Sequence, residues 1–383
     1  MSDALTTEVD DWIGVLLDQI EAAGLTNCTL ISLTSDHGTL HSKSTRQKTL
    51  SLHLLILSTL PASIGEMMGA HKHFGKGVFY AQSIKVPWGF SLPGVIPVGV
   101  FPDPVSHLDN AATILDYLNT GIDVLGDGKS LRRYLDYQGI NKEKEECFVV
   151  SEMEKRIPRN STYFGNKAGS RPELMIVHRG FKLMMPKRGF SKTLDMLINM
   201  RDDPEEMNNL VGLKGENASL AVIGRAEHLK VLLIDYMQQH DGALKVYSDP
   251  NNYFNDTRGD LFEIIRRRKW RKVALWISEW GTFTFGRPFL SNGKYVRTEY
   301  LYLGRTIPGS TEIFDIIIEG DDKEFFSVEK TAFSFVRREH VRVAVTYEND
   351  NYVSPGTMNA TLTVHSTMGT HEVQLAISAN ICP

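Results

Sequence analysis

The sequence has few cysteines and no long apolar run, and each of these absences excludes a class of protein. Three cysteines in 383 residues cannot form the dense disulfide framework of a small secreted domain, although one disulfide is possible. The most apolar stretch, residues 50–60, is too short to cross a bilayer about 30 Å thick and also contains His53. Residues 1–14 are acidic, unlike the basic start of a signal peptide. The sequence therefore predicts neither a membrane span nor a leader peptide.

The sequence also lacks a large excess of charge of either sign. Its formal net charge is -4, which argues against a nucleic-acid-binding protein. The one basic run, RRRKWRK at residues 266–272, could bind an acidic polysaccharide, but a solvated helix end is the simpler interpretation. A hydrophobic content of 42% and a charged content of 23% are ordinary for a globular protein, and the length suits two domains.

A helix followed by a strand is predicted near the start of the chain. Apolar residues recur at intervals of three and four between Val9 and Ile20, and Gly24 follows where such a helix would end. The apolar run 29–33 then predicts a buried strand leading into TSDHG at residues 34–38. Ligands of α/β sheets bind beyond the carboxyl ends of strands, where we expect Asp36 and His37. Taken alone, such a turn more often simply ends a strand.

Residues 39–65 differ in character from the sequence on either side. They contain no Asp or Glu, and their Ser, Thr and Leu residues follow no clear period. We interpret them as an insertion, either loosely structured or forming a stray helix. Folded sequence resumes at Glu66, and residues 104–118 predict a further helix with one apolar face.

The next part of the chain predicts a hairpin, a strand and a helix. ELMIVHRGFKLMMP, residues 173–186, has the pattern of a hairpin with Arg179 and Gly180 at its turn. Residues 194–210 predict a strand that enters an acidic turn, and residues 226–240 an amphipathic helix. A segment rich in turn signals, residues 248–260, is predicted to separate the two halves.

Only strands are predicted after Lys272. Short runs bounded by turns, several of them alternating apolar and polar residues, predict an immunoglobulin-like β-sandwich over residues 273–383, although the Cys…Trp…Cys signature is absent. Trp276 and Trp280 lie at its start, where we expect packing between domains rather than stacking on a sugar. Four polar residues on its strands are expected to be structural: Arg297, Thr298, Glu299 and Arg305.

Five segments within residues 9–210 carry motifs that follow one another in a recognisable order. They are residues 9–38, residues 69–88, PGVIP, PVSHLDNAATILDYL with DGKSL, and LDMLINMRDDPEEMNNL. This order resembles the sulfatase family of the alkaline phosphatase superfamily, over roughly residues 8–240. The resemblance implies an α/β fold, with a partial alkaline-phosphatase-like sulfatase domain over residues 1–260 and its C-terminal subdomain at 173–240. The β-sandwich would be appended to it.

The resemblance implies a divalent-cation site and a sulfate-binding lysine. Asp36 and His37 match the pair that ligates the cation, and the carboxylate, a hard ligand, suits Ca²⁺ or another divalent cation. The imidazole leaves room for a transition metal, as in relatives that cleave phosphate or phosphonate esters. Lys76 matches the catalytic lysine that contacts the sulfate group, where a compact ammonium can stabilise developing negative charge. His71 is assigned to the substrate edge and Tyr80 to packing.

Two departures from the family pattern limit these expectations. The family nucleophile is a Cys or Ser in C/S-x-P-S/A-R, oxidised to formylglycine, and this pentad does not occur here. The paired aspartates of the first strand are also missing, because Asp10 and Asp11 lie within the predicted helix. We therefore expect the carboxyl-terminal part of a sulfatase, with formylglycine only in a missing upstream region and no turnover by this chain alone. Removing residues 39–65 would restore the pattern, so we interpret them as a translated intron or a lineage insertion.

Two classes of function remain open. The first is a sulfuric ester hydrolase that acts on a sulfated small molecule, either a carbohydrate or an aryl ester. Within this class, phosphonate or phosphate ester hydrolysis is the alternative, and His37 favours it. The second class is a non-catalytic protein, either a pseudoenzyme or a carbohydrate-binding protein. The family resemblance implies a secreted, periplasmic or lysosomal protein, whereas the sequence itself decides neither localisation nor oligomeric state.

Overall fold

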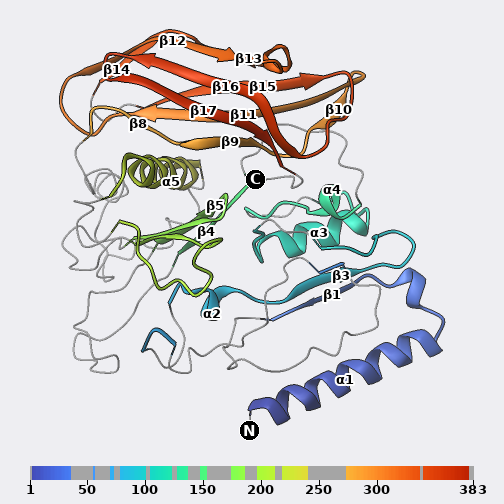
Figure 1. Cartoon of the computed structure of the whole chain (residues 1–383). Coiled ribbons are helices and arrows are strands. Elements are labelled where there is room, and N and C mark those ends of the chain that lie inside the picture. Colours follow the sequence, from blue (N-terminus) through green and yellow to red (C-terminus); the bar gives the residue numbers. More distant parts are fainter. Residues whose placement is uncertain are drawn as a thin grey trace. The chain divides into compact units, whose positions relative to one another are not determined.

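The structure is a computed structural model, in which the chain forms two compact units (Figure 1). It describes residues 2–35, 55–56, 70–72, 78–100, 104–122, 127–136, 147–152, 174–185, 196–211, 218–239, 273–336 and 340–378. Unit 1 consists of Met1–Ile64 and Lys85–Gly139, and unit 2 of Gly65–Ile84 and Ile140–Pro383. The predicted linker at 248–260 and most of the insertion at 39–65 lie outside the described residues. The predicted domain boundaries therefore stay predictions.

Unit 1 contains a small antiparallel sheet and several helices. Its elements are α1 (Ser2–Ala22), η1 (Thr26–Cys28), β1 (Ile31–Thr34), β2 (Leu55–Ile56), β3 (Trp88–Ser91), α3 (Asp109–Tyr117) and α4 (Arg132–Leu135). The strands are ordered β1-β3-β2, and both pairs are antiparallel. Gly24 follows α1 with a φ of 70°, which a glycine adopts at little cost. The predicted first helix and the strand after it are confirmed, but the prediction that this strand is buried is wrong, because its residues are half-buried or exposed.

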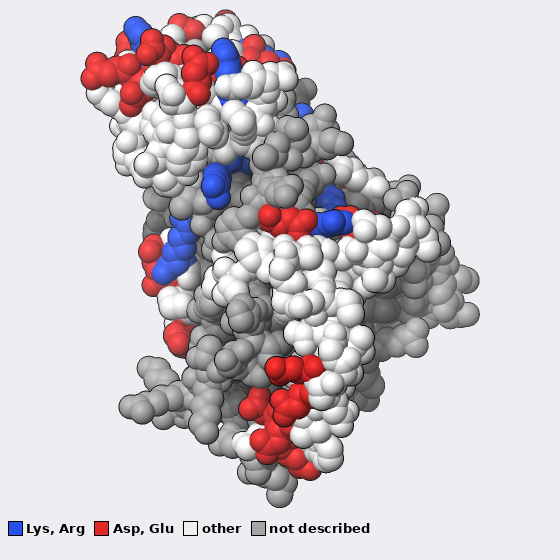
Figure 2. All heavy atoms as spheres, turned by 90° about the vertical axis from the view of Figure 1, so that its right-hand side faces the viewer, with Lys and Arg blue, Asp and Glu red and all other residues white. Residues whose placement is uncertain are grey.

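The helix α1 is exposed along its length. Trp12 is 67% exposed and Leu16 is 56% exposed, although both belong to the apolar stripe of the helix. Its charged residues are all acidic, and they contribute to the red group at the lower end of Figure 2. Among the described residues, no helix is long and apolar enough to span a bilayer.

Unit 2 begins with two short helices and a four-stranded antiparallel sheet. The elements are η2 (Ala70–Lys72), α2 (Ala81–Ile84), β4 (Phe148–Glu152), β5 (Leu174–His178), β6 (Phe181–Met185), β7 (Met196–Asn199) and α5 (Leu220–Gln239). The sheet order is β4-β5-β6-β7. Arg179 and Gly180 form the turn between β5 and β6 with φ values of 50° and 79°, the left-handed conformation that two-residue hairpin turns require. The predicted hairpin is confirmed.

Residues 273–336 and 340–378 of unit 2 form a β-sandwich (Figure 1). Its elements are β8 (Trp276–Ile277), β9 (Gly281–Phe285), β10 (Phe289–Ser291), β11 (Lys294–Gly304), β12 (Ser310–Glu319), η3 (Lys323–Phe325), β13 (Phe326–Val328), β14 (Phe333–Val336), β15 (His340–Asn349), β16 (Gly356–Ser366) and β17 (Gly369–Ile377). One sheet has the order β10-β11-β15-β13, with β8 against β11, and the other β14-β12-β16-β17-β9. Apolar residues of both sheets form one core, which includes Leu301, Val343, Ile316 and Leu362. The predicted strands are confirmed, whereas the immunoglobulin-like assignment stays a prediction.

The helix α5 packs against both the four-stranded sheet and the first strand of the sandwich. One apolar core contains Ile176, Leu233, Trp276 and Tyr302. Gly224 allows the close approach, because a Cβ at this position would lie 1.9 Å from the carbonyl oxygen of Ile277. Trp276 is 3% exposed, so it serves packing, as expected, and does not present a face to a sugar.

Five charged side chains meet where the hairpin turn, α5 and the sandwich come together. Arg179, Glu279 and Glu299 are buried, and Arg225 and Arg297 are half-buried. Arg179 contacts Glu279 at 2.9 Å and Glu299 at 2.6 Å. Arg225 of α5 contacts Glu279 at 2.7 Å, and Arg297 contacts Glu299 at 2.6 Å. Since an unpaired buried charge is costly, these groups are stable only while all three elements are together. Arg297 and Glu299 are structural, as the sequence predicts.

Candidate functional site

His71 and Tyr80 lie ring against ring at the candidate substrate edge. Their ring centroids are 3.7 Å apart and their planes differ by 3°. His71 has a left-handed backbone, with φ 50° and ψ 25°, which is uncommon for a residue other than glycine. The sequence assigned Tyr80 to packing, and the stack, together with a 3.9 Å contact from the Tyr80 hydroxyl to Met196 Sδ, agrees with that role.

The surroundings of His71 favour its neutral form. Burial lowers the pKa of its imidazole from the usual value, because a desolvated imidazolium is costly, and the negative charge of Glu206 opposes the shift only in part. Burial also raises the pKa of the Tyr80 phenol, and Glu206 raises it further. Near neutral pH both rings are therefore uncharged, so the stacked pair presents hydrogen-bonding groups without a net charge.

The backbone on both sides of Tyr80 is held by a buried ion pair between Lys182 of β6 and Glu206. Lys182 Nζ donates to the carbonyl oxygen of Phe79 at 3.0 Å and also contacts Glu206 Oε1. The amide of Ala81 donates to Glu206 Oε2 at 2.6 Å. The side chains of Lys182 and Glu206 are only 2% and 1% exposed. Two groups distant in the sequence thus fix the segment that follows Lys76.

The acidic turn after β7 brings Glu206 to this position. The Asp203 carboxylate accepts the amides of Met207 at 3.0 Å and Asn208 at 2.7 Å. Glu206 has a φ of 57°, in the left-handed region that residues other than glycine uncommonly adopt. Asn209 Oδ1 accepts the amide of Leu197 at 3.1 Å and thereby ties the turn to β7. The end of the LDMLINMRDDPEEMNNL motif has the pattern DP-x-E-x-x-N-L. Each of its polar residues forms a structural hydrogen bond: Asp203, Glu206 and Asn209.

In unit 1, polar contacts hold the strand that leads to Asp36 and His37. Ser32 donates to Asn110 Oδ1 at 2.9 Å, and Thr34 Oγ1 lies 2.8 Å from His107 Nε2. Trp88 of the neighbouring strand donates its indole N–H to Ser32 at 3.3 Å. These contacts fix the end of β1 and hence the start of the segment in which the cation ligands are predicted.

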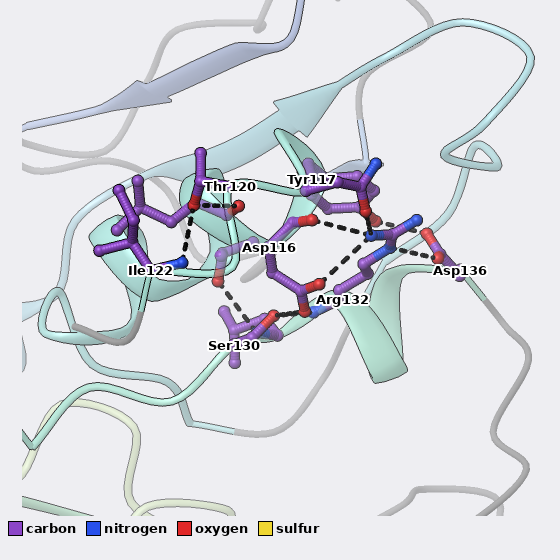
Figure 3. Close-up of polar contacts among 11 residues, drawn as sticks. Asp116, Tyr117, Thr120, Ile122, Ser130, Arg132 and Asp136 are labelled. Carbon is purple, nitrogen blue, oxygen red and sulfur yellow. Dashed lines mark hydrogen bonds and ion pairs between the residues drawn. The ribbon is translucent and has the colours of Figure 1, made fainter.

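A second polar cluster of unit 1 surrounds Arg132 and occupies the DGKSL region (Figure 3). Arg132 contacts Asp116 at 3.2 Å and Asp136 at 3.1 Å. Tyr117 donates to Asp136 Oδ1 at 2.5 Å, and Ser130 donates to Asp116 Oδ2 at 2.5 Å. Burial raises the pKa of the Tyr117 phenol, and the bond to Asp136 raises it further. The carboxylates are engaged by these partners, so this cluster joins α3 to α4 rather than holding a ligand.

Three of the predicted site residues cannot be placed. Asp36, His37 and Lys76 lie outside the described residues, so their assignment to the cation and to the sulfate group stays a prediction. The part of the chain that the structure describes contains no group of three or more His, Cys, Asp or Glu side chains arranged for a metal ion. Of the predicted site residues, only His71 is described, and its role at the substrate edge is likewise a prediction.

Sequence reasoning missed Lys182 and Glu206. The signal was present, since Lys182 interrupts the otherwise apolar strand FKLMM and Glu206 belongs to a recognised motif. A lysine in a strand between apolar neighbours indicates a buried partner, because an unpaired buried ammonium is strongly disfavoured. The identity of that partner could not be read from the sequence.

Comparison with known proteins gives one family match. Residues 2–120 match the family model described as Sulfatase. A structure of BT4656 in complex with its substrate D-glucosamine-2-N,6-O-disulfate has a TM-score of 0.44 and 24% identity, over 62% of this chain and 39% of that one. The putative sulfatase yidJ from Bacteroides fragilis has a TM-score of 0.42 and 18% identity, over 62% and 41%.

A third similar structure is the phosphonate monoester hydrolase of Agrobacterium radiobacter, with a TM-score of 0.42 and 23% identity, over 61% of this chain and 40% of that one. The chain thus spans about two fifths of the length of the structures it matches. At these TM-scores the likeness is loose, and the ligands of those proteins are properties of those proteins.

Proposed function

We propose that this chain, of which residues 2–120 match the family model described as Sulfatase, binds a sulfate ester together with a divalent cation. It would do so as part of a sulfuric ester hydrolase. Asp36 and His37 would hold the cation, Lys76 would contact the sulfate group, and His71 would lie at the substrate edge. The family match carries the proposal, because it spans all four residues. The substrate class is a sulfated carbohydrate or aryl ester.

The chemistry of these residue types suits the roles proposed for them. A carboxylate beside an imidazole is a donor set that divalent cations accept, and a bound cation would offset the charge of the sulfate oxygens. The Lys76 ammonium would donate hydrogen bonds to the sulfate group and balance charge on the leaving oxygen. His71, held neutral by burial, would offer a hydrogen bond without adding charge. Since the sequence contains no formylglycine pentad, we propose binding rather than turnover for this chain alone.

The described residues on either side of the predicted ligands support the proposal. The strand before Asp36 is tied down by Ser32 and Thr34, and the segment after Lys76 is held by Lys182 and Glu206. Binding residues need such support, because a ligand group that is misplaced by about 1 Å loses much of its effect.

Calorimetric titration of the whole chain tests the proposal. We expect para-nitrophenyl sulfate or a sulfated glucosamine to bind in the presence of Ca²⁺ or Mn²⁺ and to bind more weakly after chelation. Asp36→Asn should weaken cation binding, and Lys76→Ala should weaken ester binding about tenfold or more, the usual effect of losing one charge-assisted hydrogen bond.

Matched controls remove the same charges from other places. Asp10→Asn on the exposed helix α1 should leave cation binding unchanged. Lys294→Ala, whose side chain is 50% exposed, should leave ester binding unchanged. If ester binding needed no cation, or if Asp36→Asn bound the cation as well as the unchanged protein, the proposal would be wrong.

Hydrolysis of a phosphonate or phosphate ester is the second candidate function. His37 favours it, because an imidazole ligand suits transition metals better than Ca²⁺. The same titration with a phenyl phosphonate ester in place of the sulfate ester separates the two. Tighter binding of the phosphonate ester with Mn²⁺ than of the sulfate ester with Ca²⁺ would favour this second function.

A further inference from the structure

We propose that Lys182 and Glu206 are positioning residues, which hold the backbone of residues 79–81 so that Tyr80 keeps its ring against His71. This inference rests on the proposed function in one respect, since the positioned segment directly follows Lys76. It concerns residues for which neither the sequence motifs nor the family match assigns a task at the site.

The contacts of the pair converge on one residue. Lys182 reaches the carbonyl group of Phe79, and Glu206 reaches the amide of Ala81, so both peptide groups that flank Tyr80 are held. The two contacts join residues that are 103 and 125 positions apart in the chain. Because the backbone is held on both sides, the direction of the Tyr80 Cα–Cβ bond is held as well. The stack on His71 and the contact of the hydroxyl group with Met196 Sδ then place the ring.

Stability alone does not explain why this buried pair is charged. Replacing a buried ion pair by apolar residues of similar volume is often neutral or stabilising, because desolvation offsets the attraction of the charges. Burial lowers the pKa of Lys182, while the nearby Glu206 opposes this shift. Apolar residues, however, could not serve the two peptide groups that flank Tyr80. A buried peptide group needs a hydrogen-bond partner, and at Ala81, the first residue of α2, the amide has none within the helix.

A second buried ion pair in the same unit provides a matched comparison. Lys230 Nζ lies 3.0 Å from Glu227 Oε1, and the side chains are 4% and 11% exposed. Both residues belong to the single helix α5, three positions apart. This pair is similar to Lys182–Glu206 in composition and burial, but its ion pair joins neighbouring turns of one helix. Replacing it therefore controls for the loss of a buried ion pair as such.

Proton NMR of the His71 ring tests the positioning role directly. Ring stacking at 3.7 Å places the His71 ring protons in the shielding region of Tyr80, so their resonances lie upfield of those of an unstacked histidine. The His71→Gln variant identifies these resonances. In the double variant Lys182→Met with Glu206→Leu, both backbone contacts are lost, and we expect the upfield shift to disappear. Binding of para-nitrophenyl sulfate should weaken about tenfold as His71 loses the ring on which it stacks.

A second double variant keeps the test decisive if the first does not fold. Lys182→Met with Glu206→Gln is also uncharged but retains an oxygen that can accept the Ala81 amide. We expect an upfield shift smaller than that of the unchanged protein, and a full upfield shift in this variant would overturn the inference. The control, Glu227→Leu with Lys230→Met, should keep both the full upfield shift and the ester affinity.

The inference is overturned if a folded Lys182→Met, Glu206→Leu protein keeps the His71 shift and the ester affinity, or if the Glu227 and Lys230 control loses them equally. Failure of the proposed function is a separate outcome, in which the unchanged protein does not bind the ester. The His71 resonances alone then decide whether the pair positions Tyr80.

Discussion

Arg225 and Glu279 form a two-point ion pair between a half-buried guanidinium and a buried carboxylate, with Nη2 2.7 Å from Oε2 and Nη1 3.2 Å from Oε1. Arg179 binds the same carboxylate at 2.9 Å from the hairpin turn. The Glu279 carboxylate, at the start of the sandwich, therefore binds the Arg225 guanidinium of α5 and the Arg179 guanidinium of the hairpin turn. Its negative charge offsets the cost of removing both guanidinium groups from water.

Glu279→Gln should lower the free energy of unfolding by about 3 kcal/mol, because it removes one partner from a buried network and leaves Arg225 and Arg179 facing a neutral group. Urea denaturation followed by circular dichroism measures the change. Glu348→Gln is the control, since Glu348 is 49% exposed in its pair with Lys294 and should cost about 1 kcal/mol or less. Equal losses in the two variants would contradict this account of the network.

Acid should destabilise the protein in two stages. Burial holds the pKa of His178 well below its usual range, and Arg179 adds to the shift. In the unfolded chain a histidine titrates near pH 6.5, so the unfolded state binds the proton first and stability falls as the pH drops below about 6.5. Burial acts to raise the pKa of Glu279. The positive charges of Arg225 and Arg179 outweigh the effect of burial, so the pKa of Glu279 is lowered. Its contribution is complete above the unfolded value of about 4.3 and is lost as the pH falls below it.

Urea midpoints measured from about pH 7 down to about pH 2 check both stages of this prediction. His178→Phe should flatten the first stage and leave the second. A stability that does not change until the carboxylates titrate would show that His178 is not buried in its neutral form.

Two glycine-to-alanine changes in helices should have opposite effects. Gly224→Ala places a Cβ 1.9 Å from the carbonyl oxygen of Ile277, so α5 must move away from the sandwich, at a cost of about 1–3 kcal/mol. Gly14→Ala on α1 meets no atom within 4 Å and should stabilise the protein by up to about 1 kcal/mol through helix propensity. Thermal unfolding of both variants measures the difference. A harmless Gly224→Ala would mean that the helix does not approach the sandwich this closely.

Tyr117→Phe should destabilise unit 1 by about 1 kcal/mol, because Asp136 loses a hydrogen bond while the ring remains. Burial and this bond raise the pKa of the phenol, so Tyr117 should stay protonated at a pH at which exposed tyrosines ionise. Thermal unfolding and spectrophotometric titration give the two readouts. Tyr352→Phe, at a 46% exposed position, should leave the stability unchanged. Equal behaviour of the two variants would place Tyr117 outside the Arg132 cluster.

Much of the secondary structure could be predicted from local sequence patterns. The period of apolar residues between Val9 and Ile20 gave α1, and the Arg179–Gly180 pair between two apolar runs gave the hairpin. Alternation of apolar and polar residues gave the long strands of the sandwich. These features depend on neighbours a few residues away, and so they are legible in one sequence.

The supports of the candidate site could not be predicted in the same way. Lys182 and Glu206 meet a segment more than a hundred positions earlier, and no periodicity links partners so far apart. The partners of Lys182 and Glu206 are also backbone groups of Phe79 and Ala81, which nearly every residue has, so the residue types at these positions do not identify the contacts. The motif that contains Glu206 pointed to the family, but the task of its carboxylate became visible only in the fold.

The hairpin turn at Arg179 also bears on how such a protein can evolve. The Arg179 guanidinium forms ion pairs with Glu279 and Glu299 of the sandwich. A β-sandwich recombined from another protein would pair with Arg179 only if it carried acidic residues at the positions of Glu279 and Glu299. The C-terminal module is thus not freely interchangeable, and changes in the turn and in the sandwich must be inherited together.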